Sequence, residues 1–390
     1  MRHLLLCLLL CLALPALASE ETLNIAIVKQ ERPTVQRTSP LDDIVIDEGL
    51  AGARLGLSDI MTTGRFTGQR FKLTERTFSQ DADPAALVAT LAEDGIRFIV
   101  SVADATSTAV IAHAADAIGI VVLNTQASDD DLRNEVCSKN LLHTIPSRAM
   151  LADGLAQYLV LKRWKRWFLV AGRHPGDKLL AEAFRRAARK FGADISIEKE
   201  WTFLPGNARA DTGHVSLQSE IPSFTQVADY DVLIVADETN EFGDYFDGRT
   251  FRPRPVAGTH GLMATGWSPV NEQWGATQLQ NRFMRQTKRR MTAVDYAAWA
   301  AIRSIGEAAF RSKSPDPEKI SAYLRGSDFL LSGFKGLGQS FRSWDGQMRQ
   351  PILIAGPRLL VSASPQAGFL HRNSELDTLG QDREESQCKF

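Results

Sequence analysis

The sequence predicts an α/β protein with two similar lobes, each built on a parallel β-sheet. First, short apolar segments alternate with longer amphipathic segments along most of the chain. Strands separated by helices of about 10 to 15 residues form right-handed βαβ units, whose strands are parallel. Second, this alternation starts again near residue 148. Third, the length of 390 residues suits two domains of ordinary size.

The composition is that of an ordinary globular protein, with 44% hydrophobic and 23% charged residues and a formal net charge of −1. These values exclude a disordered chain and a low-complexity fibre. Because nucleic-acid binding usually needs a basic face, the near-neutral charge gives no support for a nucleic-acid partner. Four cysteines are too few for a fold held together by disulfides.

The first residues have the pattern of a secretory signal peptide. Arg2 and His3 precede an apolar run over residues 4–14, and Ala16-Leu17-Ala18 precedes Ser19. This pattern predicts export and cleavage after Ala18. The alternative is a buried N-terminal strand or helix. The run is shorter than the roughly 20 residues that cross a bilayer, so we expect no membrane insertion.

Cleavage would remove Cys7 and Cys11 and leave Cys137 and Cys388. Two cysteines in an oxidising compartment allow one pairing, so we predict a Cys137–Cys388 disulfide that ties the C-terminal tail to the body. The alternative is two unpaired thiols, because the sequence does not show whether their Cα atoms approach within about 7 Å.

In the first α/β run, strands and helices follow one another regularly. Apolar or alternating patterns predict strands over residues 23–28, 71–78, 97–102 and 119–123. Helical spacing predicts helices over residues 48–61, 84–93 and 106–118. The second of these helices has a clear start, since Asp83 is a favoured N-cap and Pro84 suits the first turn.

The second run begins with a predicted helix over residues 148–161. A helix over residues 178–191 ends at Gly192, a natural C-cap. Strands are predicted over residues 167–170, 195–201 and 232–235, with another from residue 255. The chain closes with a helix over 291–310, a turn at Ser343-Trp344-Asp345-Gly346 and a strand over 351–355.

Four stretches, taken in order, carry a resemblance to a known family. They are the exported start with residues 23–28, the segments 140–147 and 294–308, and the closing stretch with Phe334-Lys-Gly-Leu-Gly338 and Ser343-Trp-Asp-Gly346. Their order resembles the type I periplasmic substrate-binding proteins of ABC transporters, in the branched-chain amino-acid-binding group. Within that group, the stretches Leu142–Asp153 and Leu376–Gly380 are similar to the subgroup associated with PQQ-dependent alcohol oxidation.

The resemblance implies two Rossmann-like lobes with parallel sheets, joined by a three-strand hinge, with a ligand cleft between them. The crossings would fall near residues 145–146, 267–273 and 326–334. Residues 19–145 and about 274–326 would form the first lobe, residues 146–273 and about 327–365 the second, and residues 366–390 a C-terminal tail. Closure about such a hinge captures the ligand.

The resemblance also implies a function. The protein would be a monomeric periplasmic component of an ABC importer, with no cofactor and no enzymatic step. It would dock to a transmembrane permease and carry a small polar organic solute, amino-acid-like or linked to alcohol oxidation. A periplasmic sensor that signals to a membrane receptor is the alternative. A secreted enzyme is a third reading, but the sequence has no Gly-x-Ser-x-Gly, His-x-x-x-His or P-loop motif.

The turn after the strand over residues 97–102 supplies the first candidate ligand residues. Ligands of open α/β sheets bind at the carboxyl ends of strands, and helix starts present free N–H groups. The candidates here are Ser101, Ala103, Asp104, Thr106 and Ser107. The resemblance assigns this turn to a ligand carboxylate, whereas Asp104 would repel an anion and suits an ammonium, a hydroxyl or a metal ion. The alternative is that Asp104 or Thr106 is only a helix N-cap.

Asn124, Thr125 and Gln126 follow the next strand and would line the same wall, unless they form an ordinary turn. The adjoining Asp129-Asp130-Asp131 is interpreted as a solvated charge run. The loop over residues 31–43 would either cover the cleft or be a plain surface loop.

In the second lobe, Arg173 and His174 follow one predicted strand, and Asp237 and Glu238 follow another. The resemblance makes Asp237 or Glu238 the acid that holds a ligand amino group. Trp267, near the second crossing, either stacks on the ligand or packs in the core. Together with the acid in the first lobe, these acids predict a negative cleft. Such a cleft favours a cationic, zwitterionic or polyhydroxyl ligand, or a hard metal ion.

Overall fold

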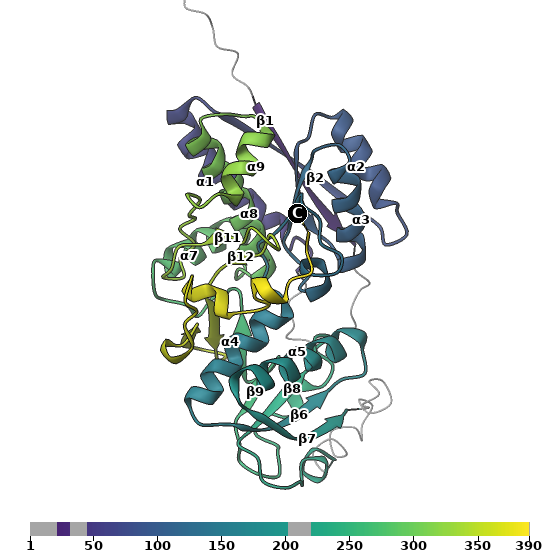
Figure 1. The fold of residues 1–390 in the computed structure, drawn as a ribbon, viewed down its shortest axis with the longest axis vertical. Helices are drawn as coiled ribbons and strands as arrows, with labels where there is room; N and C mark the ends of the chain where they lie inside the picture. The colour runs from purple at the N-terminus through teal and green to yellow at the C-terminus, as the bar shows by residue number, and fades with distance from the viewer. Residues whose placement is uncertain (1–21, 32–44, 202–219, 390) are drawn as a thin grey trace, which may run out of the picture.

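The chain forms two α/β lobes, one above the other in Figure 1. The computed structural model describes residues 22–31, 45–201 and 220–389. The predicted signal peptide and most of the loop over residues 31–43 lie outside the described residues. Within them, the predicted architecture of two lobes with parallel strands is confirmed.

The first lobe is built on a five-stranded parallel sheet with the order β2-β1-β3-β4-β5. Its strands are β1 (Thr22–Gln30), β2 (Arg70–Phe78), β3 (Phe98–Val102), β4 (Val121–Asn124) and β5 (Leu141–His143). The helices of the first run are α1 (Leu50–Thr67), α2 (Pro84–Glu93) and α3 (Ala105–Asp116), with the short η1 (Asp130–Arg133) after β4.

Several late elements return to this lobe and complete its core. They are α7 (Ala276–Thr287), α8 (Ala293–Ser312), α9 (Pro317–Arg325) and the hairpin of β11 (Ser340–Phe341) and β12 (Met348–Arg349). Figure 1 shows the green α8 and α9 beside the purple α1, although more than 200 residues separate them. The hairpin confirms the predicted turn, in which Gly346 takes a φ of +69°.

The second lobe is built on a seven-stranded sheet with the order β14-β13-β10-β9-β8-β6-β7. Its strands are β6 (Arg166–Ala171), β7 (Asp194–Glu200), β8 (Val232–Ala236), β9 (Val256–Gly258), β10 (Leu262–Thr265), β13 (Ile352–Ala355) and β14 (Leu360–Ser364). The first five are parallel, and β13 and β14 add antiparallel strands at one edge. The helices α4 (Arg148–Leu161) and α5 (Pro175–Phe191) belong to this core, and η2 (Gly243–Tyr245) follows β8.

Local sequence explains why several helices begin and end where they do. Asp83 caps α2 by accepting a bond from the Ala85 amide at 2.9 Å, as its position before a proline predicts. The helix α5 ends at Gly192, which adopts the left-handed conformation with a φ of +76°. Asp295, in the first turn of α8, accepts a bond from the Gly49 amide at 2.8 Å and so aligns the starts of α1 and α8.

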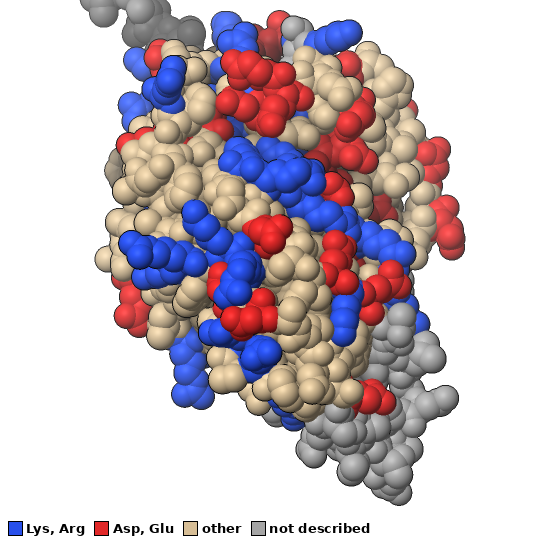
Figure 2. Space-filling model, turned by 60° about the horizontal axis from the view of Figure 1, so that its bottom comes forward, with Lys and Arg blue, Asp and Glu red and all other residues tan. Residues whose placement is uncertain are grey.

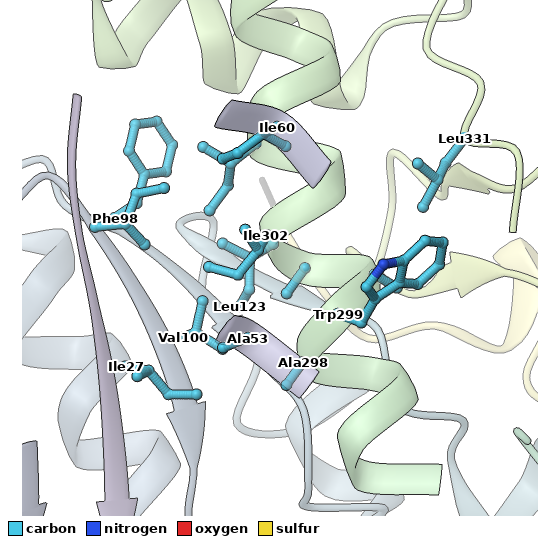
Figure 3. Close-up of a cluster of buried hydrophobic side chains, with 14 of the residues drawn as sticks. Ile27, Ala53, Ile60, Phe98, Val100, Leu123, Ala298, Trp299, Ile302 and Leu331 are labelled. Atoms are coloured by element: carbon cyan, nitrogen blue, oxygen red, sulfur yellow. The ribbon is translucent and has the colours of Figure 1, made fainter. Parts of the chain in front are cut away.

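The contact between α1 and α8 is the centre of the first core, shown in Figure 3. Ala53 and Ile60 of α1 face Ala298 and Ile302 of α8, with Phe98 of β3 on the sheet side. The two helices approach closely because glycines stand at the contact. A Cβ atom on Gly52 would lie 1.9 Å from the carbonyl oxygen of Asp295.

Three chain crossings join the lobes. The chain leaves the first core after Leu142, re-enters it at Trp267, and leaves it again between Met348 and Ile352. The third crossing therefore lies later than the expected position near residues 326–334. Phe329 and Leu331 in that stretch pack in the first core. The glycines that follow make tight turns instead, as at Gly336, where φ is +88°.

A buried polar junction, formed by Gln350 and Lys335, ties the three crossings together. The Gln350 side-chain amide donates to the carbonyl of Thr144 in the first crossing at 2.7 Å. Its oxygen accepts a bond from Lys335 Nζ at 2.5 Å, and Lys335 also donates to the carbonyl of Gly266 in the second crossing at 2.8 Å. Burial lowers the pKa of the Lys335 amine well below its usual value.

The predicted pairing of Cys137 with Cys388 is confirmed. The two residues form a disulfide across a Cα–Cα distance of 5.8 Å and 251 positions of sequence. It joins the connection between η1 and β5 to the end of the C-terminal tail, which contains three short helical turns. These turns are η3 (Ala367–Phe369), η4 (Glu375–Thr378) and η5 (Arg383–Glu385).

The close approach of α1 and α8 gives a test of the first core. In Gly52→Ala the added methyl group collides with the Asp295 backbone, so the helices must separate. We expect a loss of about 2 kcal/mol of unfolding free energy, the usual cost of overpacking. Urea unfolding, followed by circular dichroism, measures it. Gly368→Ala is the matched control, because no atom lies within 4 Å of its added Cβ. Equal midpoints for both variants would contradict this account of the core.

Candidate functional site

A cavity of about 600 Å³ lies where the carboxyl ends of β3 and β4 meet the second lobe. It is lined from both lobes by Asp104, Ala105, Thr106, Gln126, Ala127, Ser128, Asp129, Arg148 and Glu238. Four of the predicted ligand residues are among them, namely Asp104, Thr106, Gln126 and Glu238. This volume suits a small organic molecule.

Asp104 serves both as a helix cap and as part of the cavity wall. Its carboxylate accepts a bond from the Ser107 amide at 2.7 Å, which fixes the start of α3. Its own amide donates to the side chain of Gln30 at 2.9 Å, and Gln30 in turn donates to the Ser107 hydroxyl at 3.0 Å. The Asp104 residue is nevertheless exposed and lines the cavity. Asp104 can therefore cap the helix and face a ligand at the same time, so the two alternatives weighed for it are compatible.

Ser101, Asn124 and Thr125 are buried and hold the cavity wall in place rather than line it. The Thr125 hydroxyl donates to the Ser101 carbonyl at 2.8 Å. The Asn124 side chain accepts bonds from the amides of Gln126 and Ala127 and donates to the Ala127 carbonyl at 2.7 Å. It thereby shapes the turn that presents Gln126 to the cavity. Ala103, also predicted to bind ligand, is buried in a core cluster between the sheet and its helices.

Arg148 forms the centre of the charged part of the cavity. Its guanidinium makes a two-pronged contact with Glu238, with Nε and Nη2 at 2.8 and 2.7 Å from the carboxylate oxygens. On its other side, Nη1 lies 2.8 Å from Asp129. Only 10% of the Arg148 side chain is exposed, against 28% for Glu238 and 23% for Asp129. Arg148 thus links an acid of the first lobe to an acid of the second.

The charges of this site do not balance, because its lining contains the carboxylates of Asp104, Asp129 and Glu238 but one guanidinium. Burial alone would lower the pKa of Arg148, but Glu238 and Asp129 outweigh that effect and raise it, so the guanidinium stays charged. Glu238 itself is positioned by its amide, which donates to Asp177 at 2.7 Å. Asp104 faces the same space with no cation in contact within the described residues. The site therefore carries net negative charge.

The other candidates of the second lobe lie apart from this cavity. Asp237 accepts bonds from the amides of Glu241, Phe242 and Gly243, and so shapes the loop after β8. His174 Nε2 lies 2.7 Å from Glu241, and Arg173 lies 3.8 Å from the same carboxylate.

Trp267 packs in the first core, stacked on Tyr296 with 4.7 Å between ring centroids. These contacts fit the alternative in which Trp267 packs in the core, rather than the one in which it stacks on a ligand.

Sequence reasoning missed Arg148, Ser128 and Asp129. The three aspartates after β4 were interpreted as a solvated run, but only Asp131 is fully exposed. Asp130 accepts bonds from the Ala149 amide at 3.2 Å, and burial raises the pKa of its carboxyl. One sequence feature could have identified Arg148 as a site residue: it is the first residue of a predicted helix that directly follows a predicted crossing.

No three His, Cys, Asp or Glu side chains in the described part of the chain come together in a way that could hold a metal ion. None of its helices is both long and apolar enough to span a bilayer. On the face shown in Figure 2, Lys and Arg side chains are interspersed with Asp and Glu, with a basic run across the middle bordered by acids.

Comparison with known proteins agrees with this geometry. The model of the periplasmic binding protein family matches residues 35–207. A branched-chain amino acid ABC transporter periplasmic ligand-binding protein from Burkholderia xenovorans LB400 is 15% identical, with a TM-score of 0.71 over 94% of this chain and 99% of that one. The chain has the fold of the type I periplasmic binding proteins. A search among curated proteins found no match.

Two further structures of this fold show how varied its ligands are. The leucine-, isoleucine-, valine-, threonine- and alanine-binding protein from Brucella ovis is 16% identical, with a TM-score of 0.68 over 94% of this chain and 96% of that one. A solute-binding protein from Rhodopseudomonas palustris BisB5, in complex with 3,4-dihydroxybenzoic acid, is 12% identical, with a TM-score of 0.61 over 86% and 93%. The resemblance to periplasmic binding proteins is confirmed, and the PQQ-associated subgroup stays a prediction.

The Arg148 pairs give a second test. Arg148→Met removes the cation that contacts both Glu238 and Asp129. A fully buried pair broken in this way costs roughly 3–5 kcal/mol, and the partial exposure here lowers the expected loss of unfolding free energy to about 2 kcal/mol. The control is Arg311→Met, which breaks an exposed pair with Glu307 and should cost under about 0.5 kcal/mol. Similar urea midpoints for the two variants would show that the Arg148 pairs contribute nothing.

Proposed function

We propose that this protein is the periplasmic solute-binding component of an ABC importer and captures a small polar organic solute between its lobes. The observation that carries the proposal is the cavity to which both lobes contribute charged side chains, beside a hinge of three crossings. A solute that contacts both walls favours the closed arrangement of the lobes over the open one. A transmembrane permease then receives the closed, loaded form.

The compared structures support the binding role but leave the ligand open, since a fold alone does not fix what it binds. Those structures are named as binding proteins, one for leucine, isoleucine, valine, threonine and alanine and another in complex with 3,4-dihydroxybenzoic acid. The signal peptide predicted over residues 1–18 supports a periplasmic location. We propose a monomer that acts by binding alone, with no catalytic step.

The charge of the cavity narrows the range of ligands that we propose. Arg148 already contacts two carboxylates, whereas Asp104 uses one contact for its helix cap and faces the cavity. An ammonium group near Asp104 would gain a charge-assisted hydrogen bond. Thr106, Gln126 and Ser128 add groups that suit hydroxyls. An amino-acid-like solute or an amino alcohol fits this lining, and the latter fits a role linked to alcohol oxidation.

A thermal-shift screen of residues 19–390 tests the binding role. The panel comprises amino acids, amino alcohols, polyols, organic acids and polyamines. A ligand at about 100 times its Kd should add roughly 2.7 kcal/mol to the unfolding free energy, which raises Tm visibly. The binding role would be contradicted if no compound raised Tm. If every hit kept its affinity in both Asp104→Asn and Glu238→Gln, the solute would bind outside this cavity.

Asp104→Asn separates the charge of this residue from its capping role. Asparagine caps helices about as well as aspartate, so α3 should keep its start and the protein its stability. We expect an ammonium-bearing hit to lose affinity at least about tenfold, or about 1.4 kcal/mol, in titration calorimetry. Asp116→Asn, at the exposed far end of the same helix, is the control and should bind as the unchanged protein does. Equal affinity in the two variants would remove Asp104 from the site.

A further inference from the structure

The segment Leu376–Cys388, here called the strap, contacts both lobes. In Figure 1 the yellow C-terminal chain passes in front of α4 and ends beside the first lobe, at the mark C. Residues 376–380 of the strap are buried, whereas residues 381–388 are all exposed or half-buried. The strap therefore has a buried part between the lobes and an exposed end that is closed by the disulfide.

The second lobe holds the strap through Gly380. The Gly380 amide donates to Asp153 of α4 at 2.8 Å. Its carbonyl accepts bonds from Arg186 at 2.8 Å and Lys190 at 2.9 Å, both on α5. The same two cations also contact the fully buried Asp153. Leu379, the residue before, lies in the core of the second lobe.

The first lobe holds the strap through the hairpin of β11 and β12. Arg342, only 1% exposed, donates to Asp377 at 3.0 Å and to the Leu379 carbonyl at 2.7 Å. Arg349 donates to the same Asp377 oxygen at 2.8 Å. Further along, the Gln387 amide donates to Asn134 at 2.7 Å, next to the disulfide.

These anchors alternate between the lobes along a short stretch of chain. Asp377 is held by the first lobe, Gly380 by the second, and Cys388 by the first again. A rotation that separates the lobes must stretch or break this sequence of contacts. The strap also borders the cleft, because Gln381 and Arg148 line one cavity of about 230 Å³ together with Arg186 of α5.

We propose that the strap limits how far the lobes open and that the Cys137–Cys388 disulfide holds its exposed end to the first lobe. The exposed part makes few contacts of its own, among them the ion pair of Glu385 with Arg186 at 3.0 Å. Without the covalent bond this part is free to detach, since exposed ion pairs contribute little. The open state then reaches wider angles, and the apparent affinity for any cleft ligand falls because fewer molecules are close to the closed state.

Small-angle X-ray scattering of the ligand-free full-length mature protein tests the proposal. Dithiothreitol converts the disulfide to two thiols and becomes a cyclic disulfide itself, so one folded sample is measured before and after reduction. We expect the radius of gyration to shift to a larger value on reduction. The double variant C137S/C388S should show the larger value without reductant, and dithiothreitol should not change it further.

Asp377→Asn loosens the first-lobe anchor without touching sulfur and should also shift the radius of gyration upward. Glu384→Gln, an exposed strap residue, is the matched control and should leave it unchanged. Circular dichroism confirms that each sample is folded; if C137S/C388S does not fold, the reduced wild-type protein decides. An unchanged scattering profile on reduction and in Asp377→Asn, or an equal shift in Glu384→Gln, overturns the proposal. Because no ligand is used, this outcome is independent of the proposed transport role.

Discussion

The polar junction of Gln350 and Lys335 joins the three crossings to one another by buried hydrogen bonds. Buried amides and amines are costly unless they are hydrogen-bonded, and Gln350 and Lys335 meet this condition only through groups of all three crossings. A displacement of one crossing relative to the others would leave a buried donor or carbonyl without a partner. The crossings therefore move as a unit, and the lobes can change their angle only about this point.

The geometry of the cleft follows from that junction. Arg148 is the first residue of α4, directly after the first crossing, so the junction fixes the place from which its side chain extends. Asp129 and Glu238, on opposite lobes, both contact it. When the lobe angle changes, the guanidinium must give up at least one of these acids. The ion pairs and the lobe angle are thus coupled, and a ligand that alters the charge balance also alters the preferred angle.

Much of the fold could be predicted from the sequence, because caps, proline positions and apolar periodicity act locally. Asp83 and Gly192 mark helix ends that the structure confirms. The rule that ligands bind at the carboxyl ends of strands placed Asp104 and Glu238, and both line the cavity. The pairing of Cys137 with Cys388 followed from the loss of the other two cysteines.

The rest depends on contacts between distant segments, which local patterns do not encode. Three consecutive aspartates look alike whether they are solvated or face an arginine across a hinge, and so Asp129 and Arg148 were missed. A glycine-rich stretch has the same composition in a crossing as in a tight turn. This is why the sequence placed the third crossing too early, near residues 326–334. The short strands β10 and β14 have mostly half-buried side chains, a weak signal for a strand.

The net negative charge of the cleft bears on which class of solute can bind there. Arg148 cannot serve a ligand carboxylate fully without leaving Glu238 or Asp129, and Asp104 would repel that carboxylate. A solute whose only charge is negative therefore meets an unfavourable field on both walls. A solute with an ammonium group meets a favourable one and leaves the existing pairs intact. We therefore expect the proposed site to discriminate between solutes by charge before it discriminates by shape.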